Sequence, residues 1–174
     1  QELSPGEPFS PDQVDYGNVI SYKTQLLRTA FDRLEHAPES MRQSISAFVS
    51  REESWLQDYA LFMALKQRFG WQMWTQWPPA IAMRQPQALT RWRTELAQEI
   101  DFQCFLQYLF FQQWQAVRRY AHQRDILIIG DVPIFVGLDS ADVWCHRDLF
   151  QLDDDGQPVA VAGVPPDYFS ETGQ

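Results

Sequence analysis

A run of four apolar residues, Ile126 to Ile129, constrains the fold more than any other part of the sequence. The run is rich in β-branched residues and does not alternate with polar ones, which is typical of a strand buried on both faces in a parallel sheet. It follows a helical pattern that extends from Leu89 to about Arg124. A long helix followed by a buried strand is the αβ unit of an α/β fold. We therefore expect an α/β protein with one buried strand at about 126–136.

The part of the chain before this unit is predicted to be helical. Asp15 can cap a first helix, which Pro38 interrupts, and a short second helix is expected around residues 41–49. A third helix, from about Trp55, is expected to stop at Gly70, because glycine adopts the left-handed conformation that ends many helices.

Three tryptophans, Trp71, Trp74 and Trp77, fall three residues apart before Pro78. This spacing places the indoles on one side of a turn or a 3₁₀ segment. They could form a platform that stacks on sugar rings, or a wedge that packs the helices together. We favour the packing interpretation, because most aromatic side chains of a globular protein fill its core.

Asp131 directly follows the predicted strand and is the first candidate site residue. In barrel enzymes, polar residues at the carboxyl end of a strand lie at the active face; the alternative is an aspartate that only turns the chain. Further on, residues 139–144 are predicted to form a capped short helix, and residues 153–156 a turn between two short strands. The three aspartates of that turn lack the alternating ligand spacing of an EF-hand loop, which argues against calcium.

Composition and charge exclude several classes of function. The net charge of −9, with only 14 Lys and Arg, disfavours nucleic-acid binding. Cys104 and Cys145 are the only cysteines and have no metal-ligand spacing, so we expect no metal and no cofactor. The sequence contains no secretory signal pattern and no apolar stretch long enough to span a bilayer, so we expect a cytoplasmic protein without a membrane partner. Linker-like residues at the start and an abrupt end suggest a piece of a longer chain.

Three segments together resemble the 4-α-glucanotransferases, also called amylomaltases or disproportionating enzymes. They are residues 128–136 with 139–144, the loop of residues 162–174, and the helical stretches 99–102, 110–114 and 120–121. The loop, which is similar to the active-site lid of the family, is the most specific of them. The resemblance is weak before residue 50 and strong after about residue 98. Small departures occur at Phe135, Gly137 and Cys145-His146.

The resemblance implies part of a (β/α)₈ barrel with helical insertions. Residues 1–97 would form the helical insertion region, and residues 98–174 a barrel helix, a barrel strand and the lid of one larger catalytic domain. The family transfers α-1,4-glucan segments between maltooligosaccharides, with retention of configuration through a covalent intermediate. Such chemistry needs two carboxyls roughly 5 Å apart. In the family these lie on later strands, so no catalytic residue is expected in this chain.

The same resemblance assigns roles to six residues. Asp131 would support the active site at the third barrel strand. The residues expected to bind substrate are Asp167, Tyr168, Phe169, Glu171 and Gln174. The expected partners are α-1,4-glucans, maltooligosaccharides and the remainder of the barrel, and we expect the segment to be stable only within that barrel.

Three other interpretations remain open. The chain could be a non-catalytic α-glucan-binding module, a helical interaction domain without a sugar role, or part of an α-amylase-type hydrolase. The last class usually has an Asn-His pair after the corresponding strand, where this chain has Pro133 to Val136.

Overall fold

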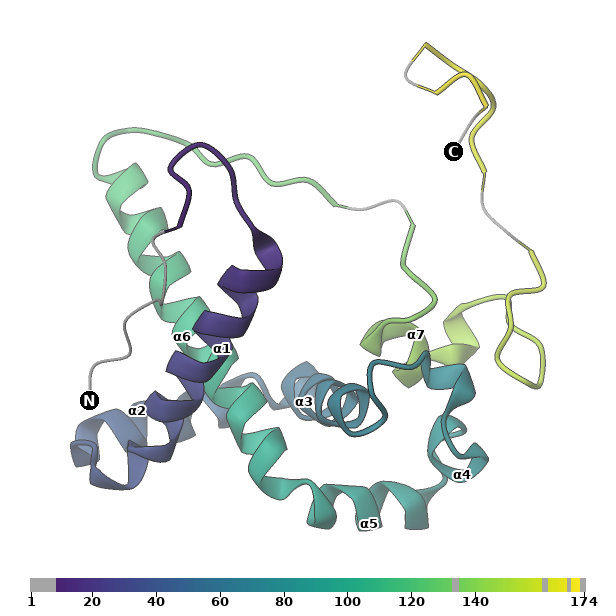
Figure 1. Cartoon of the computed structure of the whole chain (residues 1–174), viewed down its shortest axis with the longest axis horizontal. Helices are drawn as coiled ribbons and strands as arrows, with labels where there is room; N and C mark the ends of the chain where they lie inside the picture. The colour runs from purple at the N-terminus through teal and green to yellow at the C-terminus, as the bar shows by residue number, and fades with distance from the viewer. Residues whose placement is uncertain (1–8, 133–134, 161–162, 169, 173–174) are drawn as a thin grey trace.

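The computed structural model describes residues 9–132, 135–160, 163–168 and 170–172, and its regular structure is helical (Figure 1). The longer helices are α1 (Tyr16–Asp32), α2 (Glu39–Arg51), α3 (Glu53–Arg68), α5 (Pro86–Glu95) and α6 (Ala97–His122). The short ones are η1 (Leu34–His36), η2 (Trp74–Gln76), α4 (Pro79–Ala82), α7 (Ala141–Cys145) and η3 (Arg147–Leu149). The helical character expected for most of the chain is confirmed.

The predicted ends of the first and third helices are also confirmed. Asp15 caps α1, and its Oδ1 accepts a hydrogen bond from the Asn18 amide at 3.1 Å. Gly70 follows α3 with a φ of +61°, which costs a glycine little because it lacks a Cβ. Trp71 continues in the same left-handed region, with a φ of +64°, and its amide donates to the Lys66 carbonyl at 2.7 Å.

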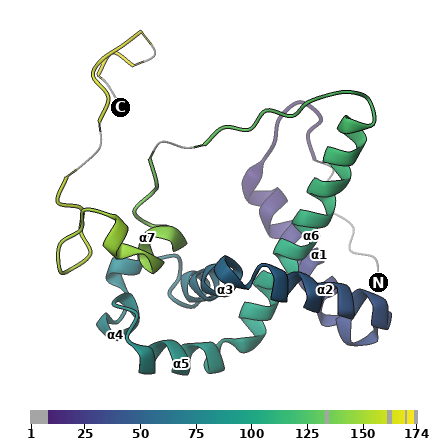
Figure 2. The same cartoon turned by 180° about the vertical axis from the view of Figure 1, so that it is seen from behind.

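The helical pattern predicted from Leu89 to Arg124 is divided in the structure. The chain bends at Leu96, between α5 and α6, and Figures 1 and 2 show the two helices running in different directions. Trp92, Leu96 and Ile100 are all buried on the two sides of this bend. The bend lets both helices turn their apolar residues toward one core, which a straight helix of this length could not do.

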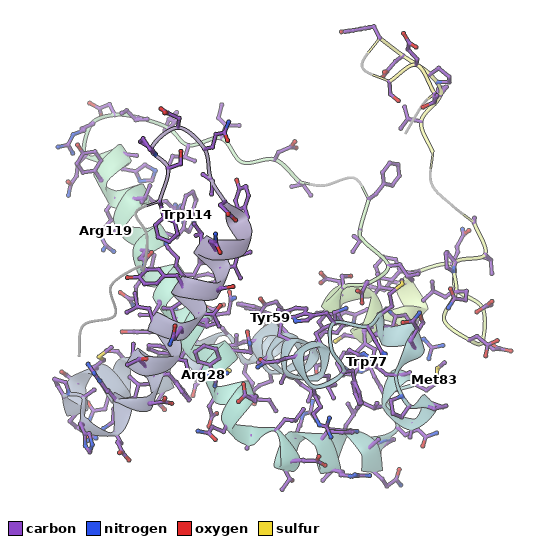
Figure 3. The ribbon with its side chains drawn as sticks, in the orientation of Figure 1. Arg28, Tyr59, Trp77, Met83, Trp114 and Arg119 are labelled. Carbon is purple, nitrogen blue, oxygen red and sulfur yellow. The ribbon has the colours of Figure 1, made fainter. Side chains whose placement is uncertain are left out.

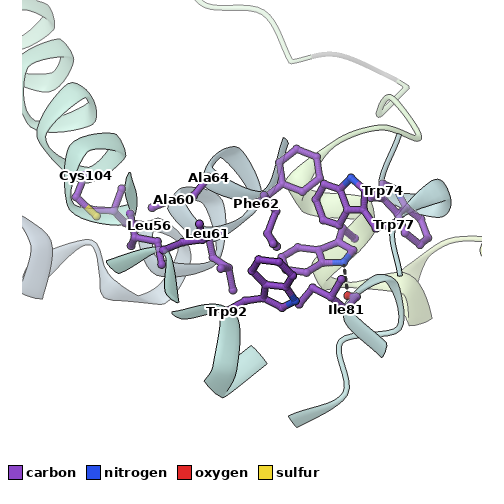
Figure 4. Packing of buried hydrophobic residues seen from close by; sticks show 14 of the residues in the cluster. Leu56, Ala60, Leu61, Phe62, Ala64, Trp74, Trp77, Ile81, Trp92 and Cys104 are labelled. Atoms are coloured by element: carbon purple, nitrogen blue, oxygen red, sulfur yellow. Dashed lines mark hydrogen bonds between the residues drawn. The ribbon is translucent and has the colours of Figure 1, made fainter. Parts of the chain in front are cut away.

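The hydrophobic core lies around α3, and Figure 4 shows how its buried side chains pack. Of the other helices, α6 makes the most extensive contacts with α3. Leu56, Leu61 and Leu65 of α3 are fully buried, and each contributes about 2 kcal/mol of hydrophobic stabilisation. Trp77 packs against both Phe62 and Trp144, with ring centroids 5.5 and 5.7 Å from its own.

The packing interpretation of the tryptophan series holds for two of its three members. Trp74 and Trp77 are buried within the core, whereas Trp71 is 62% exposed. The indole N–H of Trp144, which comes from α7, donates to the Ile81 carbonyl at 3.2 Å and ties α7 to α4. Trp92 of α5 belongs to the same core. Four tryptophans, Trp74, Trp77, Trp92 and Trp144, therefore help to join α3, η2, α4, α5 and α7.

The buried strand expected at 126–136 is not formed among the described residues 126–132, 135 and 136. They have no regular structure, and Leu127 and Ile129 are 82% and 93% exposed; Pro133 and Ile134 lie outside the described residues. A strand needs a neighbour whose backbone pairs with its own N–H and C=O groups. In the part of the chain that the structure describes, the bridge between Leu152 and Pro158 is the one β-type pairing, so segment 126–132 has no partner.

That bridge closes the predicted turn of residues 153–156. The Gly156 amide donates to the Asp153 carbonyl at 3.0 Å, and Gly156 has a φ of +78°. The turn is confirmed, although a single bridge replaces the two short strands that were expected. Across the described ranges, no helix combines the length and apolarity that crossing a bilayer requires.

Candidate functional site

Asp131 lies on an exposed stretch of chain that leaves the end of α6. The stretch begins at Ile126, whose amide donates to the Ala121 carbonyl at 3.0 Å. The Asp131 carboxylate is exposed, and its Oδ1 accepts a hydrogen bond from the neighbouring Val132 amide at 2.8 Å. Asp131 is thus presented to solvent, at a point between two attachments of its segment to the helical body.

Three of the predicted substrate-binding residues, Asp167, Tyr168 and Glu171, lie on a second exposed stretch. Asp167 and Ser170 close a turn, in which the Ser170 amide donates to Asp167 Oδ1 at 2.9 Å and the Asp167 amide donates to the Ser170 carbonyl at 3.0 Å. Tyr168 is 91% exposed and Glu171 is exposed. Phe169 and Gln174 lie outside the described residues.

The structure does not bring these two stretches together. Figures 1 and 2 show segment 126–132 and segment 163–168 as separate stretches that leave the helical body in different directions. Trp74 nevertheless contacts the chain near each of them, at Leu138 and Asp139, which follow the Asp131 stretch, and at Gly156, whose turn precedes the second stretch.

The first attachment is an ion pair between a buried lysine and a partly exposed aspartate. The Lys66 ammonium, on a side chain 7% exposed, donates to Asp139 Oδ2 at 2.6 Å. It also donates to the carbonyls of Trp71 and Gln72 at 2.9 and 2.8 Å. All three N–H donors of the lysine therefore have an acceptor, which is what a buried ammonium requires.

Trp74 completes this attachment and provides the second one. Its backbone N–H donates to Asp139 Oδ1 at 3.3 Å, and its indole N–H donates to the Leu138 carbonyl at 2.7 Å. The far edge of the same indole lies against Gly156, so closely that a Cβ on Gly156 would come within 2.8 Å of Trp74 Cζ3. One buried indole thus holds both the end of the Asp131 segment and the turn that precedes the second stretch.

A second polar cluster, formed by Asp58, Arg84 and Arg93, contacts α7 at Cys145. Asp58 forms ion pairs with Arg84 and Arg93 at 2.8 and 2.9 Å, and Arg84 also donates to Cys145 Sγ at 3.2 Å. Burial raises the pKa of the Cys145 thiol to about 12, although the positive charge of Arg84 opposes this shift. The thiol is therefore protonated at neutral pH and is a poor nucleophile.

The helix α6 carries two further perturbed groups. Burial raises the pKa of Asp101, and burial together with the negative charge of Asp101 raises the pKa of the Cys104 thiol to about 11. Both cysteines are free thiols.

Within the described ranges, no three His, Cys, Asp or Glu side chains are grouped as a metal site. In the acidic turn, Asp153 Oδ1 accepts hydrogen bonds from the amides of Asp155 and Gln157, so this carboxylate serves to close the turn.

Two shallow hollows lie at the carboxyl end of α6. One, of about 210 Å³, is lined by Gln115, Arg118, Arg119 and His122, and the other, of about 330 Å³, by His122, Asp125, Ile126 and Leu127. Figure 3 shows Arg119 on this part of the helix. Neither hollow is lined by Asp131 or by a described residue of the predicted lid loop.

Sequence reasoning missed the cluster of Lys66, Trp74 and Asp139. The available signals were a lysine on the apolar side of the third helix and the tryptophan spacing. Neither signal could identify the partner, because Lys66 and Asp139 are 73 positions apart in the sequence.

Three comparisons with known proteins point to one family. The sequence model of a family described as 4-alpha-glucanotransferase matches residues 1–174. The 4-alpha-glucanotransferases of Thermus thermophilus and of a Synechocystis strain are 48% and 46% identical over 95% and 99% of this chain. An amylomaltase from Streptococcus agalactiae, solved in complex with acarbose, covers 99% of the chain with a TM-score of 0.87 and 39% identity.

The chain spans about a third of the length of these relatives: 33% and 34% of the two enzymes and 34% of the amylomaltase. The family match, however, extends over every residue of the chain, and the structural likeness covers its helical body as well as its loops. The chain therefore belongs to the 4-alpha-glucanotransferase family.

Proposed function

We propose that this chain is part of a 4-α-glucanotransferase that moves α-1,4-glucan segments between maltooligosaccharides by retaining double displacement. The observation that carries the proposal is the family match across residues 1–174. The two carboxyls that such chemistry requires, roughly 5 Å apart, would be supplied by residues outside this chain. The amylomaltase with the similar fold was solved with acarbose bound, which supports a saccharide-type ligand for the complete protein.

The exposed apolar segment supports the second part of the proposal, a (β/α)₈ barrel completed by the rest of the protein. Leu127, Ile129 and Val132 are each more than 80% exposed. Exposed apolar side chains on an unpaired backbone are expected where neighbouring strands are missing. In the complete barrel, residues 126–136 would pair with strands from the remainder of the chain and become the buried strand that their composition predicts.

In that barrel, Asp131 would lie at the carboxyl end of its strand and support the site through hydrogen bonds to charged neighbours. The exposed ring of Tyr168, with Phe169, would stack on glucose rings. The hydrogen-bonding groups offered to sugar hydroxyls would be those of Asp167, Glu171 and Gln174.

The loop that carries these residues would act as a lid. A transferase must let an acceptor sugar reach the covalent intermediate before water does, and a loop that closes over the donor excludes water. Replacing both Tyr168 and Phe169 with alanine in the complete enzyme is expected to lower the ratio of transfer to hydrolysis. An unchanged ratio would show that the two rings have no part in excluding water.

Maltotriose disproportionation tests the proposal directly. The assay is run on the 174-residue chain and on the full-length protein, and glucose and longer oligomers are measured. We expect only the full-length protein to be active. Activity of the 174-residue chain would show that the catalytic carboxyls lie within that chain. If neither is active but the short chain binds maltooligosaccharide tightly by isothermal titration, the chain is a glucan-binding module instead.

A further inference from the structure

The two segments that carry the predicted site residues are joined to the helical body at one cluster. Segment 126–139, which contains Asp131, ends at Asp139, and the stretch that leads to Tyr168 begins after the turn of residues 153–156. Both ends contact Trp74 or its immediate partners, as the distances given above establish. Trp74 therefore contacts both the residues that end the Asp131 segment and the turn that precedes the stretch with Tyr168.

The cluster is built to resist a displacement of Trp74. Lys66 and Asp139 form an ion pair of which the lysine is almost fully buried, and Asp139 uses its second oxygen to accept from the Trp74 backbone. Attraction between charges is stronger away from water, and every polar group of the cluster has a partner. Removing the lysine would take away the ammonium that faces Asp139 Oδ2 and the hydrogen bonds it donates to the Trp71 and Gln72 carbonyls.

We propose that Lys66, Trp74 and Asp139 form a positioning cluster that sets the placement of Asp131 and of the lid relative to each other. Lys66 acts through Asp139, which anchors the Asp131 segment, while Trp74 connects that anchor to the turn that carries the lid. None of the three is a catalytic residue. The inference rests on the proposed function, because the roles of Asp131 and the lid come from it.

The chain offers a matched control for a purely structural effect. Arg28 of α1 and Glu99 of α6 form an ion pair at 2.5 Å, with side chains 27% and 31% exposed. This pair also joins two helices, but it contacts neither site segment. Figure 3 shows Arg28 on the opposite side of α3 from Trp77, which packs beside α7. A variant of Arg28 therefore tests loss of stability without loss of positioning.

The experiment uses the full-length enzyme with Lys66→Met, Lys66→Arg and Arg28→Met. Melting temperatures are measured first, and kcat, KM and the transfer-to-hydrolysis ratio for maltotriose are then measured where every variant is folded. Because a 1 Å misplacement at an active site, even one caused from a distance, can cost about 100-fold in rate, we expect Lys66→Met to lower kcat about 10- to 100-fold and to shift the ratio toward hydrolysis. Lys66→Arg, which keeps the charge, is expected to recover part of kcat.

Arg28→Met is expected to lower the melting temperature while leaving kcat and the ratio within about twofold of the wild type. The proposal is overturned if Lys66→Met leaves kcat and the transfer-to-hydrolysis ratio unchanged, or if Arg28→Met lowers them as much as Lys66→Met does. Should Lys66→Met fail to fold, Asp139→Asn, which keeps the size of the side chain, is judged by the same two criteria. A failure of the proposed function would be distinct, because the wild-type enzyme itself would then lack disproportionation.

Discussion

Replacing Gly156 with alanine tests the packing of the acidic turn on Trp74. Gly156 is buried and has a φ of +78°, a conformation that disfavours every residue with a Cβ. The added methyl would also approach the Trp74 ring, within 2.8 Å of Cζ3 and even closer to Cη2. The indole cannot easily move away, because it is fully buried and its N–H donates to the Leu138 carbonyl.

The two effects have separate magnitudes. The left-handed conformation costs an alanine about 1 kcal/mol relative to glycine, and forcing an extra methyl into a packed core costs about 1–3 kcal/mol. We therefore expect Gly156→Ala to lower the free energy of unfolding by about 2–4 kcal/mol. The loss should appear as a lower urea midpoint for the full-length protein, while the slope of the unfolding free energy against urea concentration stays unchanged.

Gly70→Ala is the control for backbone strain alone. Gly70 has a similar φ of +61°, but beyond its two neighbours in the chain no atom lies within 4 Å of the position its Cβ would take. We expect this variant to lose only about 1 kcal/mol. Equal losses for Gly156→Ala and Gly70→Ala would refute the reasoning, since they would show that the turn moves away from Trp74 without cost.

Three further predictions concern other parts of the chain. Because the pKa of Cys104 is about 11 and that of Cys145 about 12, the thiolate is scarce at neutral pH, and neither residue should react with a thiol reagent until the protein unfolds. Asp15→Ala removes the cap of α1, a loss of about 1 kcal/mol that should speed hydrogen exchange of the Asn18 amide several-fold; Asp15→Asn should not. Trp71→Gly removes the strain of a left-handed φ but raises the conformational entropy of the unfolded chain, so the two effects oppose each other. The urea midpoint should therefore stay nearly constant, and a large fall would show that the exposed indole is packed.

The features that could be predicted from the sequence are those decided by a few neighbouring residues. Asp15 as a cap, Gly70 as a helix end and Gly156 as a turn residue each depend on contacts within about four positions. The bend at Leu96 could not be predicted in this way. Local propensity favours one long helix there, and the bend arises because α5 and α6 must both reach the core around α3.

The predicted substrate-binding residues were identified by the resemblance to a family, whereas Asp131 was identified first by its position after the predicted strand. Asp131 and Tyr168 are exposed and lie on irregular backbone, so burial does not mark them in this chain. The cluster around Lys66 is the reverse case, since it is conspicuous in the structure but hidden in the sequence. Its partners come from α3, the segment before α7 and the turn after η3, and only the folded chain brings them together.

The apolar residues of the chain divide into two groups with different physical needs. Those of α3 and its neighbours are buried by contacts within the chain, so the helical body encloses its own core. Those of segment 126–132 are exposed, although burying each of Leu127 and Ile129 would contribute about 2 kcal/mol. Side chains at these positions also cannot fold back onto the body while their backbone lacks a partner strand, because a buried, unpaired backbone group costs more than it gains. The strand pattern in the sequence therefore fits the proposed barrel, in which neighbouring strands would supply the backbone partners that segment 126–132 lacks here.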